Sequence, residues 1–476
     1  MVSANQPQGV GTRAYGCEST RRYAAPAMTT EQTKHDLASL RLQNVIRHNR
    51  RGERLGVYSI CSANLEVIDA ALRQAVADGS FLLIESTSSQ VNQFGGYTGQ
   101  APDQFAAAVR SAAQRLGLNE GMLMLGGDHL GPYPWRDQPS EAALTNARAL
   151  VRACVLAGYG KIHLDASMAC ADDDGARLRD HVIAQRAAAL CRASESAYEE
   201  LPTGSPPLLY VIGTEVPTPG GETHPGEAPE VTRVEQVHST LQVFRTAFER
   251  NGVERAWERV IGIVVQPGVE FGEGVIFDYD RGKAQALSTA LPEHPFLVYE
   301  AHSTDYQSPT ALGHMVEDHF GILKVGPALT FRFREAIFAL SAIEYEWLAS
   351  KRGIQLSRVR EALEAAMLRN PSYWGSHYHG TEDEQQFARA FSYSDRCRYY
   401  WCDPVVQQEI GRLYGNLSGF SLPQTVVSQY LPSEYEAIRA GKLSADPKAI
   451  IEHHVRAMLR RYAAACGTLS DLDHMG

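Results

Sequence analysis

Short apolar runs alternate with longer amphipathic stretches along the middle of the chain. The runs lack the apolar/polar alternation of a half-buried strand and end abruptly in Gly, Ser or charged residues. Strands that are apolar throughout indicate a parallel sheet that is buried on both faces. The eight runs are LGVYSI (55–60), FLLIES (81–86), MLMLGG (122–127), KIHLDA (161–166), LYVIGTE (209–215), VIGIVVQ (260–266), FLVYEAH (296–302) and GILKVG (321–326).

The stretches that follow these runs repeat apolar residues at i, i+3 and i+4, which predicts helices. The clear ones are 64–78, 103–116, 140–157, 178–196, 233–251 and 329–348, and two shorter ones are 281–291 and 308–318. Eight strand–helix units in succession predict an α/β protein, a (β/α)8 TIM barrel. An open doubly wound sheet is the rival, but it would normally carry a glycine-rich nucleotide motif, and the FGGYTG segment at 94–99 has its glycines wrongly spaced.

The two ends of the chain have different patterns from the middle. From about residue 351 the pattern predicts helices separated by short turns. This part of the chain is rich in Tyr, Arg and Trp, as in SYSDRCRYYW at 392–401. We interpret this tail as a helical subdomain that packs on the barrel or on a neighbouring subunit, with its aromatic residues in the core and interface. The expected division is a disordered or extension leader at 1–40, a catalytic barrel at 41–350 and the C-terminal subdomain at 351–476.

Composition and charge narrow the class of protein. Of 476 residues, 44% are hydrophobic and 21% charged, which is ordinary globular composition. A net charge of −10 without a long Lys/Arg stripe argues against nucleic acid and anionic membrane as partners. Eight cysteines form no Cys-x-x-Cys pair, and the N-terminus has no secretory apolar segment. These features favour a cytoplasmic protein with reduced thiols.

Polar residues concentrate where the predicted strands end, which is where barrels place their chemistry. His163 and Asp165 share one face of a strand, as do Glu300 and His302, although the pattern does not say which face is inward. Charged groups are excluded from interiors unless they are paired or bound to metal. The strand-end residues are Glu85, Asp128, His129, His163, Asp165, Glu215, Gln266, Glu300, His302 and, just beyond, Asp305.

Two imidazoles and one carboxylate make a site for Zn²⁺ or a similar divalent ion, with an open position for a substrate oxygen. The candidate ligands are His129, Glu215 and His302. Two other histidine pairs lie in the tail, away from predicted strand ends: His377 with His379, and His453 with His454. A Schiff-base lysine is the other alternative, with Lys161 and Lys324 as the strand candidates.

Several segments resemble class II, metal-dependent aldolases, and most closely the tagatose-bisphosphate aldolase Z-type subunits, a bacterial family that includes tagatose 6-phosphate 4-epimerases. The resemblance extends over about residues 41–465. The segments that carry it are IESTSSQVNQFGGYTG, LGGDHLGP, KIHLDASM, VIGTEVPTPGGE, VVQPGVEF, VYEAHSTDYQ and LKVGPALTFRFREAIFAL.

The resemblance implies that His129 and His302 bind a divalent metal, that Glu215 is a ligand or its close neighbour, and that Asp128 is the acid/base carboxylate. Gln266 stands where a class II aldolase would supply a third histidine, and KVGP at 324–327 lacks the expected Asn-x-Asp. Zn²⁺ is the expected ion, with Mn²⁺, Ni²⁺ or Co²⁺ as alternatives. Asp165 and Glu85 are further catalytic candidates.

The implied activity is 4-epimerisation of D-tagatose 6-phosphate, by retro-aldol cleavage between C3 and C4 of the ketohexose and re-addition. The alternative is a non-catalytic accessory subunit of class II D-tagatose-1,6-bisphosphate aldolase, which would bind a partner aldolase. A free ketohexose also stays open as substrate, and we expect a homo-oligomer. Backbone N–H groups at a helix N-terminus are candidates for a phosphate, and loop amides for sugar hydroxyls. The substrate-binding candidates are Gln90, Asn92, Gln93, Ser303, Thr304, Asp305 and Gly326.

Overall fold

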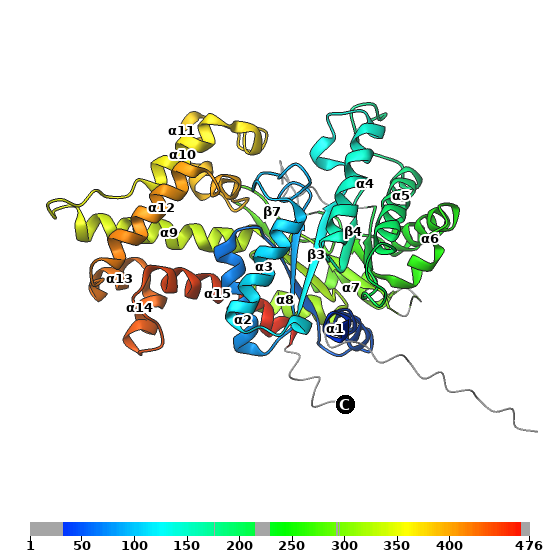
Figure 1. The fold of residues 1–476 in the computed structure, drawn as a ribbon, viewed down its shortest axis with the longest axis horizontal. Coiled ribbons are helices and arrows are strands. Elements are labelled where there is room, and N and C mark those ends of the chain that lie inside the picture. Colours follow the sequence, from blue (N-terminus) through cyan, green and yellow to red (C-terminus); the bar gives the residue numbers. More distant parts are fainter. Residues whose placement is uncertain (1–31, 176, 215–228, 292–293, 295, 468–476) are drawn as a thin grey trace, which may run out of the picture.

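A closed barrel of parallel strands forms the centre of the computed structural model (Figure 1). The model describes residues 32–175, 177–214, 229–291, 294 and 296–467. The barrel strands are β1 (Val57–Cys61), β2 (Leu82–Thr87), β3 (Leu123–Leu130), β4 (Lys161–Leu164), β5 (Leu209–Ile212), β6 (Val260–Val265), β9 (Val298–Ala301) and β10 (Ile322–Val325). Each lies within or overlaps one of the eight apolar runs, so the predicted (β/α)8 barrel is confirmed.

Each barrel strand pairs with its neighbour in chain order, and β1 closes the barrel against β10 through Val57–Ile322 to Ile60–Val325. A short antiparallel ribbon that the sequence pattern did not predict, β7 (Glu270–Phe271) with β8 (Ile276–Phe277), lies in the connection after β6. Except for β1 and β2, which are partly exposed at their last residue, the barrel strands are buried throughout. This is the pattern of a parallel sheet covered on both faces.

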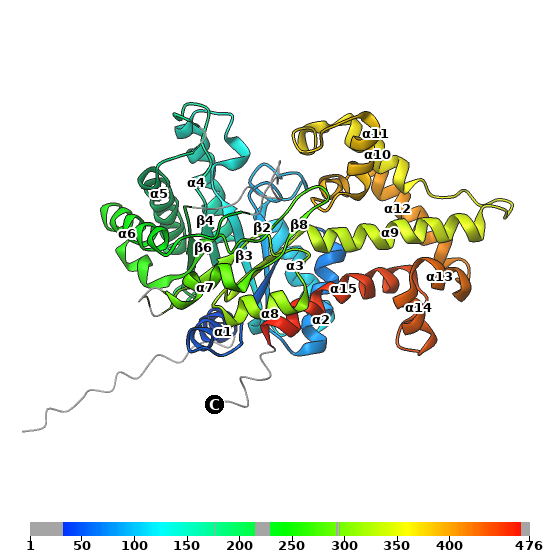
Figure 2. The same cartoon turned by 180° about the vertical axis from the view of Figure 1, so that it is seen from behind.

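Helices surround the barrel, as Figures 1 and 2 show from opposite sides. Helix α2 illustrates how the sequence sets their ends: the Asn64 side chain caps its first turn, and Gly79 closes it with a φ of 63°. The outer helices are α2 (Leu65–Asp78), α3 (Pro102–Leu116), α4 (Ser140–Leu156), α5 (Asp180–Tyr198), α6 (Val234–Arg250), α7 (Arg281–Thr289), α8 (Pro309–Glu317) and α9 (Pro327–Leu348). All eight predicted stretches are helical.

A further helix, α1 (Gln32–Arg50), lies under the end of the barrel at which the strands begin. Leu42, Val45 and Ile46 are buried on one face of α1 and pack in one apolar cluster with barrel residues such as Leu83 and Ile322. Helix α1 begins at Gln32, within the residues 1–40 that were expected to form a disordered or extension leader, and the division of the chain into domains stays a prediction. The apolar spacing of Ala38, Leu42, Val45 and Ile46 explains why this segment is helical.

The tail consists of helices that extend from one side of the barrel, and its last helix returns to it (Figure 2). Helix α15 packs against α2, α8 and α9, and its Tyr462 hydroxyl donates a 2.8 Å hydrogen bond to the Thr304 carbonyl. The tail helices are α10 (Val359–Arg369), α11 (Glu382–Phe391), α12 (Pro404–Ser418), α13 (Gln424–Tyr430), α14 (Pro432–Arg439) and α15 (Pro447–Cys466), with the short turn η5 (Arg396–Tyr400). Among the helices of the described residues, none is long and apolar enough to cross a membrane.

Candidate active site

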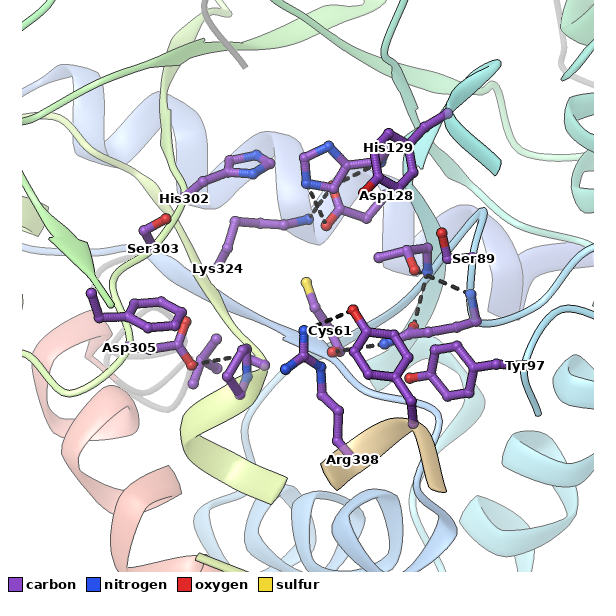
Figure 3. Close-up of a pocket in the computed structure, with 18 residues that line it drawn as sticks. Cys61, Ser89, Tyr97, Asp128, His129, His302, Ser303, Asp305, Lys324 and Arg398 are labelled. Carbon is purple, nitrogen blue, oxygen red and sulfur yellow. Dashed lines mark hydrogen bonds and ion pairs between the residues drawn. The ribbon is translucent and has the colours of Figure 1, made fainter. Parts of the chain in front are cut away.

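A pocket opens at the end of the barrel where the strands finish, which is the functional face of such barrels (Figure 3). Strand ends, the loop between β2 and α3, the β7 strand and the η5 turn of the tail all contribute to it. The lining residues are Cys61, Thr87, Ser89, Gln90, Tyr97, Asp128, His129, Tyr133, Phe271, His302, Ser303, Asp305, Lys324, Val325, Gly326, Pro327, Arg398 and Tyr399.

A network of buried charges lies within the barrel beneath this pocket. The Lys161 ammonium lies 2.8 Å from Glu85 Oε1 and 2.8 Å from Glu300 Oε2, and all three side chains are fully buried. The Lys324 ammonium contacts the Glu85 carboxylate and lies 3.0 Å from Asp128 Oδ1. Gly126 leaves room for this network, because a Cβ there would come within 2.7 Å of Glu85 Oε1. The mutual pairing of these groups offsets the desolvation cost of their burial.

Both lysines carry a charge in this network. Burial would lower the pKa of Lys324, but Asp128, the thiol of Cys61 and the two glutamates raise it, and the pKa stays well above the ordinary lysine value. The pKa of Lys161 is raised by Glu300 and Glu85 against the same effect of burial. A Schiff-base nucleophile must lose its proton first. The surroundings of Lys161 and Lys324 therefore disfavour that role for either residue.

Three imidazole rings face one another at the pocket end of the network. The ring centroids are 5.2 Å apart for His129 and His163, 4.8 Å for His129 and His302, and 5.3 Å for His163 and His302. His163 Nδ1 lies 2.9 Å from Asp128 Oδ1 and 3.2 Å from the backbone nitrogen of His129, which also contacts Asp128 Oδ1. In the tautomer whose Nδ1–H donates to the Asp128 carboxylate, Nε2 keeps its lone pair. That Nε2 atom is buried and has no hydrogen-bond partner among the residues that the structure describes. A buried imidazole nitrogen without a partner fits a metal ligand.

The donors around this nitrogen also fit a divalent cation. One ligand atom each of Asp128, His163, Glu300 and His302 can be chosen so that all four lie within 4.8 Å of one another. His129 stands beside them with its Nδ1 2.8 Å from Asp165 Oδ2, which leaves its Nε2 available as a ligand. Mixed imidazole and carboxylate donors suit Zn²⁺ and similar ions. The buried cluster could therefore hold a metal ion.

This ligand set differs from the one expected from the sequence. His129 and His302 both lie at the site, as expected, but Glu215 lies outside the described residues. Glu300 and Asp128 supply the carboxylates within the described part, and His163 adds a third imidazole. Gln266 has a structural place instead, because its side-chain oxygen accepts the N–H groups of Gly268 and Val269.

The electrostatics keep Asp128 and His302 in the forms that ligands need, whereas Asp128 and Asp165 raise the pKa of His129 against the effect of its burial. Burial would raise the pKa of Asp128, but His129 and Lys324 hold it well below its usual range. Burial lowers the pKa of His302 to about 4, although its hydrogen bond to Glu300 acts in the opposite direction. Asp128 is therefore a carboxylate and His302 a neutral imidazole near neutral pH.

The backbone at His129 is bent sharply toward the pocket. His129 has a φ of 46°, in the left-handed region that costs a non-glycine residue on the order of 1–3 kcal/mol. The register between β3 and β4 shifts at the same point, between Gly127 and Leu130. Gly131 then passes so close to β4 that a Cβ would lie 1.6 Å from the Asp165 carbonyl oxygen. This close approach brings His129 and Asp165 within hydrogen-bonding distance.

Two of the three expected catalytic carboxylates do not line the pocket. Asp128 does line it, whereas Glu85 is completely buried beneath it. Glu85 binds both lysines and the Ser59 hydroxyl, so its position does not support the catalytic role expected of it. Asp165 accepts from His129 and from the Ser167 hydroxyl at 2.6 Å, which makes it a residue that orients His129.

The loop between β2 and α3 contributes one of its three expected substrate-binding residues to the pocket. Gln90 lines the pocket and donates to the Cys61 carbonyl at 3.3 Å. Asn92 is buried, and its side-chain oxygen accepts the N–H groups of Phe94 and Gly96 as a turn former does. Gln93 donates to the Asn146 carbonyl, away from the pocket. Asn92 and Gln93 therefore have structural positions.

The expected phosphate-binding segment is arranged differently from the prediction. Ser303, Asp305 and Gly326 line the pocket, whereas Thr304 is buried and donates to the Lys324 carbonyl at 2.6 Å. Asp305 Oδ1 accepts the N–H groups of Gly326 at 3.0 Å and Ala328 at 2.7 Å. The chain's own carboxylate thus takes the backbone donors that were expected to bind phosphate.

Several lining residues escaped sequence reasoning. Arg398 and Tyr399 come from the tail segment interpreted as core and interface, and they reach the pocket beside Tyr97. The ring centroids of Tyr97 and Tyr399 are 4.7 Å apart. The dense Tyr and Arg content of 392–401 was the available signal. The other histidine pairs stay apart from the pocket: His454 lies 3.2 Å from both Glu434 and Glu335, and His377 contacts Ser376.

The solved structures that resemble this chain include a strong match over most of its length. A probable tagatose 6 phosphate kinase from Sinorhizobium meliloti 1021 is 42% identical with a TM-score of 0.78, and the match covers 86% of this chain and 100% of that one. The fructuronate-tagaturonate epimerase UxaE from Cohnella laeviribosi is 12% identical with a TM-score of 0.42, covering 87% of this chain and 81% of that one.

The family comparison agrees with the motifs at the strand ends. Residues 42–467 match the model of the D-tagatose-1,6-bisphosphate aldolase subunit GatZ/KbaZ-like family. The match includes every barrel strand and the tail helices through α15. The resemblance recognised from the sequence is therefore confirmed. The chain belongs to the D-tagatose-1,6-bisphosphate aldolase subunit GatZ/KbaZ-like family.

Proposed function

We propose that this chain is a divalent-cation-dependent enzyme that cleaves and re-forms the C3–C4 bond of a phosphorylated ketohexose, and that it acts as a D-tagatose 6-phosphate 4-epimerase. One observation carries the proposal. Three imidazoles and the carboxylates of Asp128 and Glu300 converge at the pocket end of the barrel, and the Nε2 of His163 has no hydrogen-bond partner within the described part of the chain. A chain that served only as a structural support would have no use for such a cluster.

His163, His302 and Glu300 would hold the ion, with Asp128 next to them and His129 oriented beside them by Asp165. We expect Zn²⁺, which these donors suit, with Mn²⁺, Ni²⁺ or Co²⁺ as substitutes. A bound divalent cation would polarise the C2 carbonyl and stabilise the negative charge that develops during cleavage. The Lys324 ammonium, 3.0 Å from Asp128 Oδ1, adds a fixed positive charge at the same end of the pocket.

Asp128 is the acid/base group of the proposed reaction, since it is the carboxylate that both lines the pocket and belongs to the cluster. It takes the proton of the C4 hydroxyl as C4 becomes a carbonyl and the C3–C4 bond breaks. The electron pair of that bond passes through C2 to its oxygen and gives an enediolate. The aldehyde half then presents its other face, the bond re-forms, and Asp128 returns the proton to the C4 oxygen. The product differs from the substrate only in the configuration at C4.

Two other activities fit the surroundings less well. The Sinorhizobium meliloti relative is called a probable tagatose 6 phosphate kinase, but this sequence has no glycine-rich nucleotide motif after a strand. The family description names an aldolase subunit, which leaves an accessory role as the alternative. A purely accessory subunit gives no reason for a His163 Nε2 that lacks a partner among the described residues, or for the left-handed backbone at His129. Both features favour a catalytic chain, which we expect to be cytoplasmic and homo-oligomeric.

The decisive experiment is to incubate the purified chain alone with D-tagatose 6-phosphate and Zn²⁺, and to follow fructose 6-phosphate and triose products by NMR. We expect fructose 6-phosphate without accumulated triose, and reversal from the fructose side. Accumulation of triose would make the chain an aldolase. No reaction until a partner aldolase is added would make it the accessory subunit, and either result would overturn the proposal.

A further inference from the structure

The pocket has a second end, opposite the imidazole cluster, where the tail supplies a cation. In Figure 3 the guanidinium of Arg398 points into the pocket from below, while Lys324, Asp128 and His302 lie on the far side. Arg398 belongs to the η5 turn, far along the chain from the barrel strands that carry the cluster. A substrate that reaches both ends would contact the barrel with one part and the tail with another.

Among the described residues, Arg398 is held by hydrogen bonds to neutral groups, while the carboxylates of Asp305 and Asp395 act on it through space. Its Nη1 donates to the carbonyls of Ser394 and Asp395, the latter at 3.1 Å, and its Nη2 donates to the Tyr399 hydroxyl at 2.9 Å. Within the described residues, all the hydrogen bonds of this guanidinium go to oxygens without a formal charge. A half-buried arginine that is positioned by neutral groups keeps its charge available for an anionic ligand.

Aromatic rings pack around Arg398. The Tyr399 ring stacks on Tyr373, with centroids 4.6 Å apart and planes 4° from parallel, and Tyr97 packs edge-on against both rings, at 4.7 Å from Tyr399 and 6.0 Å from Tyr373. Arg396 and Arg398 are among the charges that lower the pKa of nearby His377 to about 3, after the larger effect of its burial. Two cationic side chains, Arg396 and Arg398, therefore lie at this end of the pocket, although the chain as a whole carries a net charge of −10.

The position where such barrels usually bind a phosphate is occupied by a side chain of the protein itself. Asp305 places its buried carboxylate at the N-terminus of α9 and accepts the Gly326 and Ala328 N–H groups there. In many barrels this helix-terminal position binds the substrate phosphate. Here a phosphate would meet a carboxylate in place of free donors. The anionic group must bind elsewhere in the pocket, and Arg398 is the lining cation outside the carboxylate-paired network below the imidazoles.

We propose that Arg398 binds the terminal phosphate of the sugar, and that Asp305 excludes the phosphate from the α9 N-terminus. This inference rests on the proposed function for the identity of the sugar. If Arg398 binds the phosphate, the tail determines the preference of the pocket for phosphorylated over free ketohexoses. It also gives the aldehyde half a tether, because C4 to C6 with the phosphate stay attached to Arg398 while the aldehyde turns its other face.

The test measures equilibrium binding by calorimetry, which does not depend on turnover. D-Tagatose 6-phosphate and free D-tagatose are each titrated into the Zn²⁺-loaded wild type and into Arg398→Gln, Arg398→Lys and Arg439→Gln. Arg439 lies exposed on α14 and serves as the matched control. Circular dichroism establishes that each variant is folded.

We expect Arg398→Gln to lose about 10-fold to 100-fold in affinity for the phosphate ester, the range of charge-assisted hydrogen bonds. Its affinity for free tagatose should stay within about 2-fold, Arg398→Lys should be intermediate, and Arg439→Gln should match the wild type. A wild type that binds both sugars equally, or an Arg398→Gln variant that keeps the full preference, would overturn the inference.

Asp305→Asn separates the two phosphate positions and covers the case in which Arg398→Gln fails to fold. If the phosphate binds at Arg398, removal of the Asp305 charge leaves the affinity for the ester within a few-fold of the wild type. If the phosphate binds at the α9 N-terminus, the same change removes a repulsion and strengthens binding by more than about 10-fold, which would contradict the assignment. Failure of the epimerase assay does not change these binding outcomes, so the two proposals can fail separately.

Discussion

The two ends of the barrel interior are built from the same strands and have opposite chemistry. Leu83 and Glu85 lie two residues apart on β2, Val298 and Glu300 on β9, and Ile322 and Lys324 on β10. The first member of each pair packs in the apolar cluster closed by α1, and the second belongs to the charged network under the pocket. One two-residue step along an inward face therefore separates the core from the site.

This difference assigns stability and chemistry to different layers. The apolar end buries aliphatic side chains that contribute on the order of 1.5–3 kcal/mol each. The charged end gains little net stability from its ion pairs, because pairing mainly offsets desolvation. The burial of these charges is therefore explained by their function at the pocket and not by stability. Perturbations of the two ends should therefore have separable effects, one on activity and the other on unfolding.

Removal of the metal should have the largest effect on activity and leave the apolar end intact. We expect EDTA treatment to reduce 4-epimerase turnover on the order of 1,000-fold, because several kcal/mol of charge stabilisation are lost. Addition of Zn²⁺ should restore turnover, and the far-UV circular dichroism should not change. Metal analysis should find a bound ion in the wild type and none in His302→Ala. Unchanged turnover in the metal-free protein would remove the ion from the mechanism.

Asp128→Asn should have the next largest effect on activity. The amide keeps the size of the side chain and an acceptor for Lys324 but cannot take up a proton. We expect kcat to fall at least about 100-fold, about 2.7 kcal/mol, the usual scale of acid/base catalysis. The matched control is Asp137→Asn, an exposed carboxylate in the connection between β3 and α4. Near-normal kinetics in Asp128→Asn would exclude Asp128 as the acid/base group.

The same comparison explains how much of the molecule could be predicted from its sequence. All eight strands could be found because buried parallel strands are continuous apolar runs, and the helices between them keep a 3.6-residue period. Uniform burial also hides which face of a strand points inward. The inward positions of His163 and Glu300 became visible only when the closed barrel brought them to Asp128 and Lys161.

The other differences between the sequence-based predictions and the structure have two physical causes. Arg398 is brought to the pocket by packing of the tail. The local periodicity of apolar residues does not indicate such a contact between distant segments. Carboxylates at strand ends look alike in sequence, although Glu85 neutralises lysines, Asp165 orients an imidazole and Asp305 caps a helix. The role of each depends on its partner. Residue type and position along a strand therefore identify the candidates without assigning their roles.

Leu42→Ala should have the smallest effect on activity and a clear effect on stability. Leu42 is fully buried on α1 against the start of the barrel strands, so its truncation should cost about 2–5 kcal/mol of unfolding free energy. Leu40 on the same helix is 50% exposed, and Leu40→Ala should change the unfolding free energy by at most about 0.5 kcal/mol. Urea unfolding followed by circular dichroism measures both. Because the apolar layer lies between α1 and the charged network, kcat of folded Leu42→Ala should stay within about 2-fold of the wild type. A large loss of kcat in that variant would mean that the two ends of the barrel are coupled and that the proposed separation of stability from chemistry is wrong.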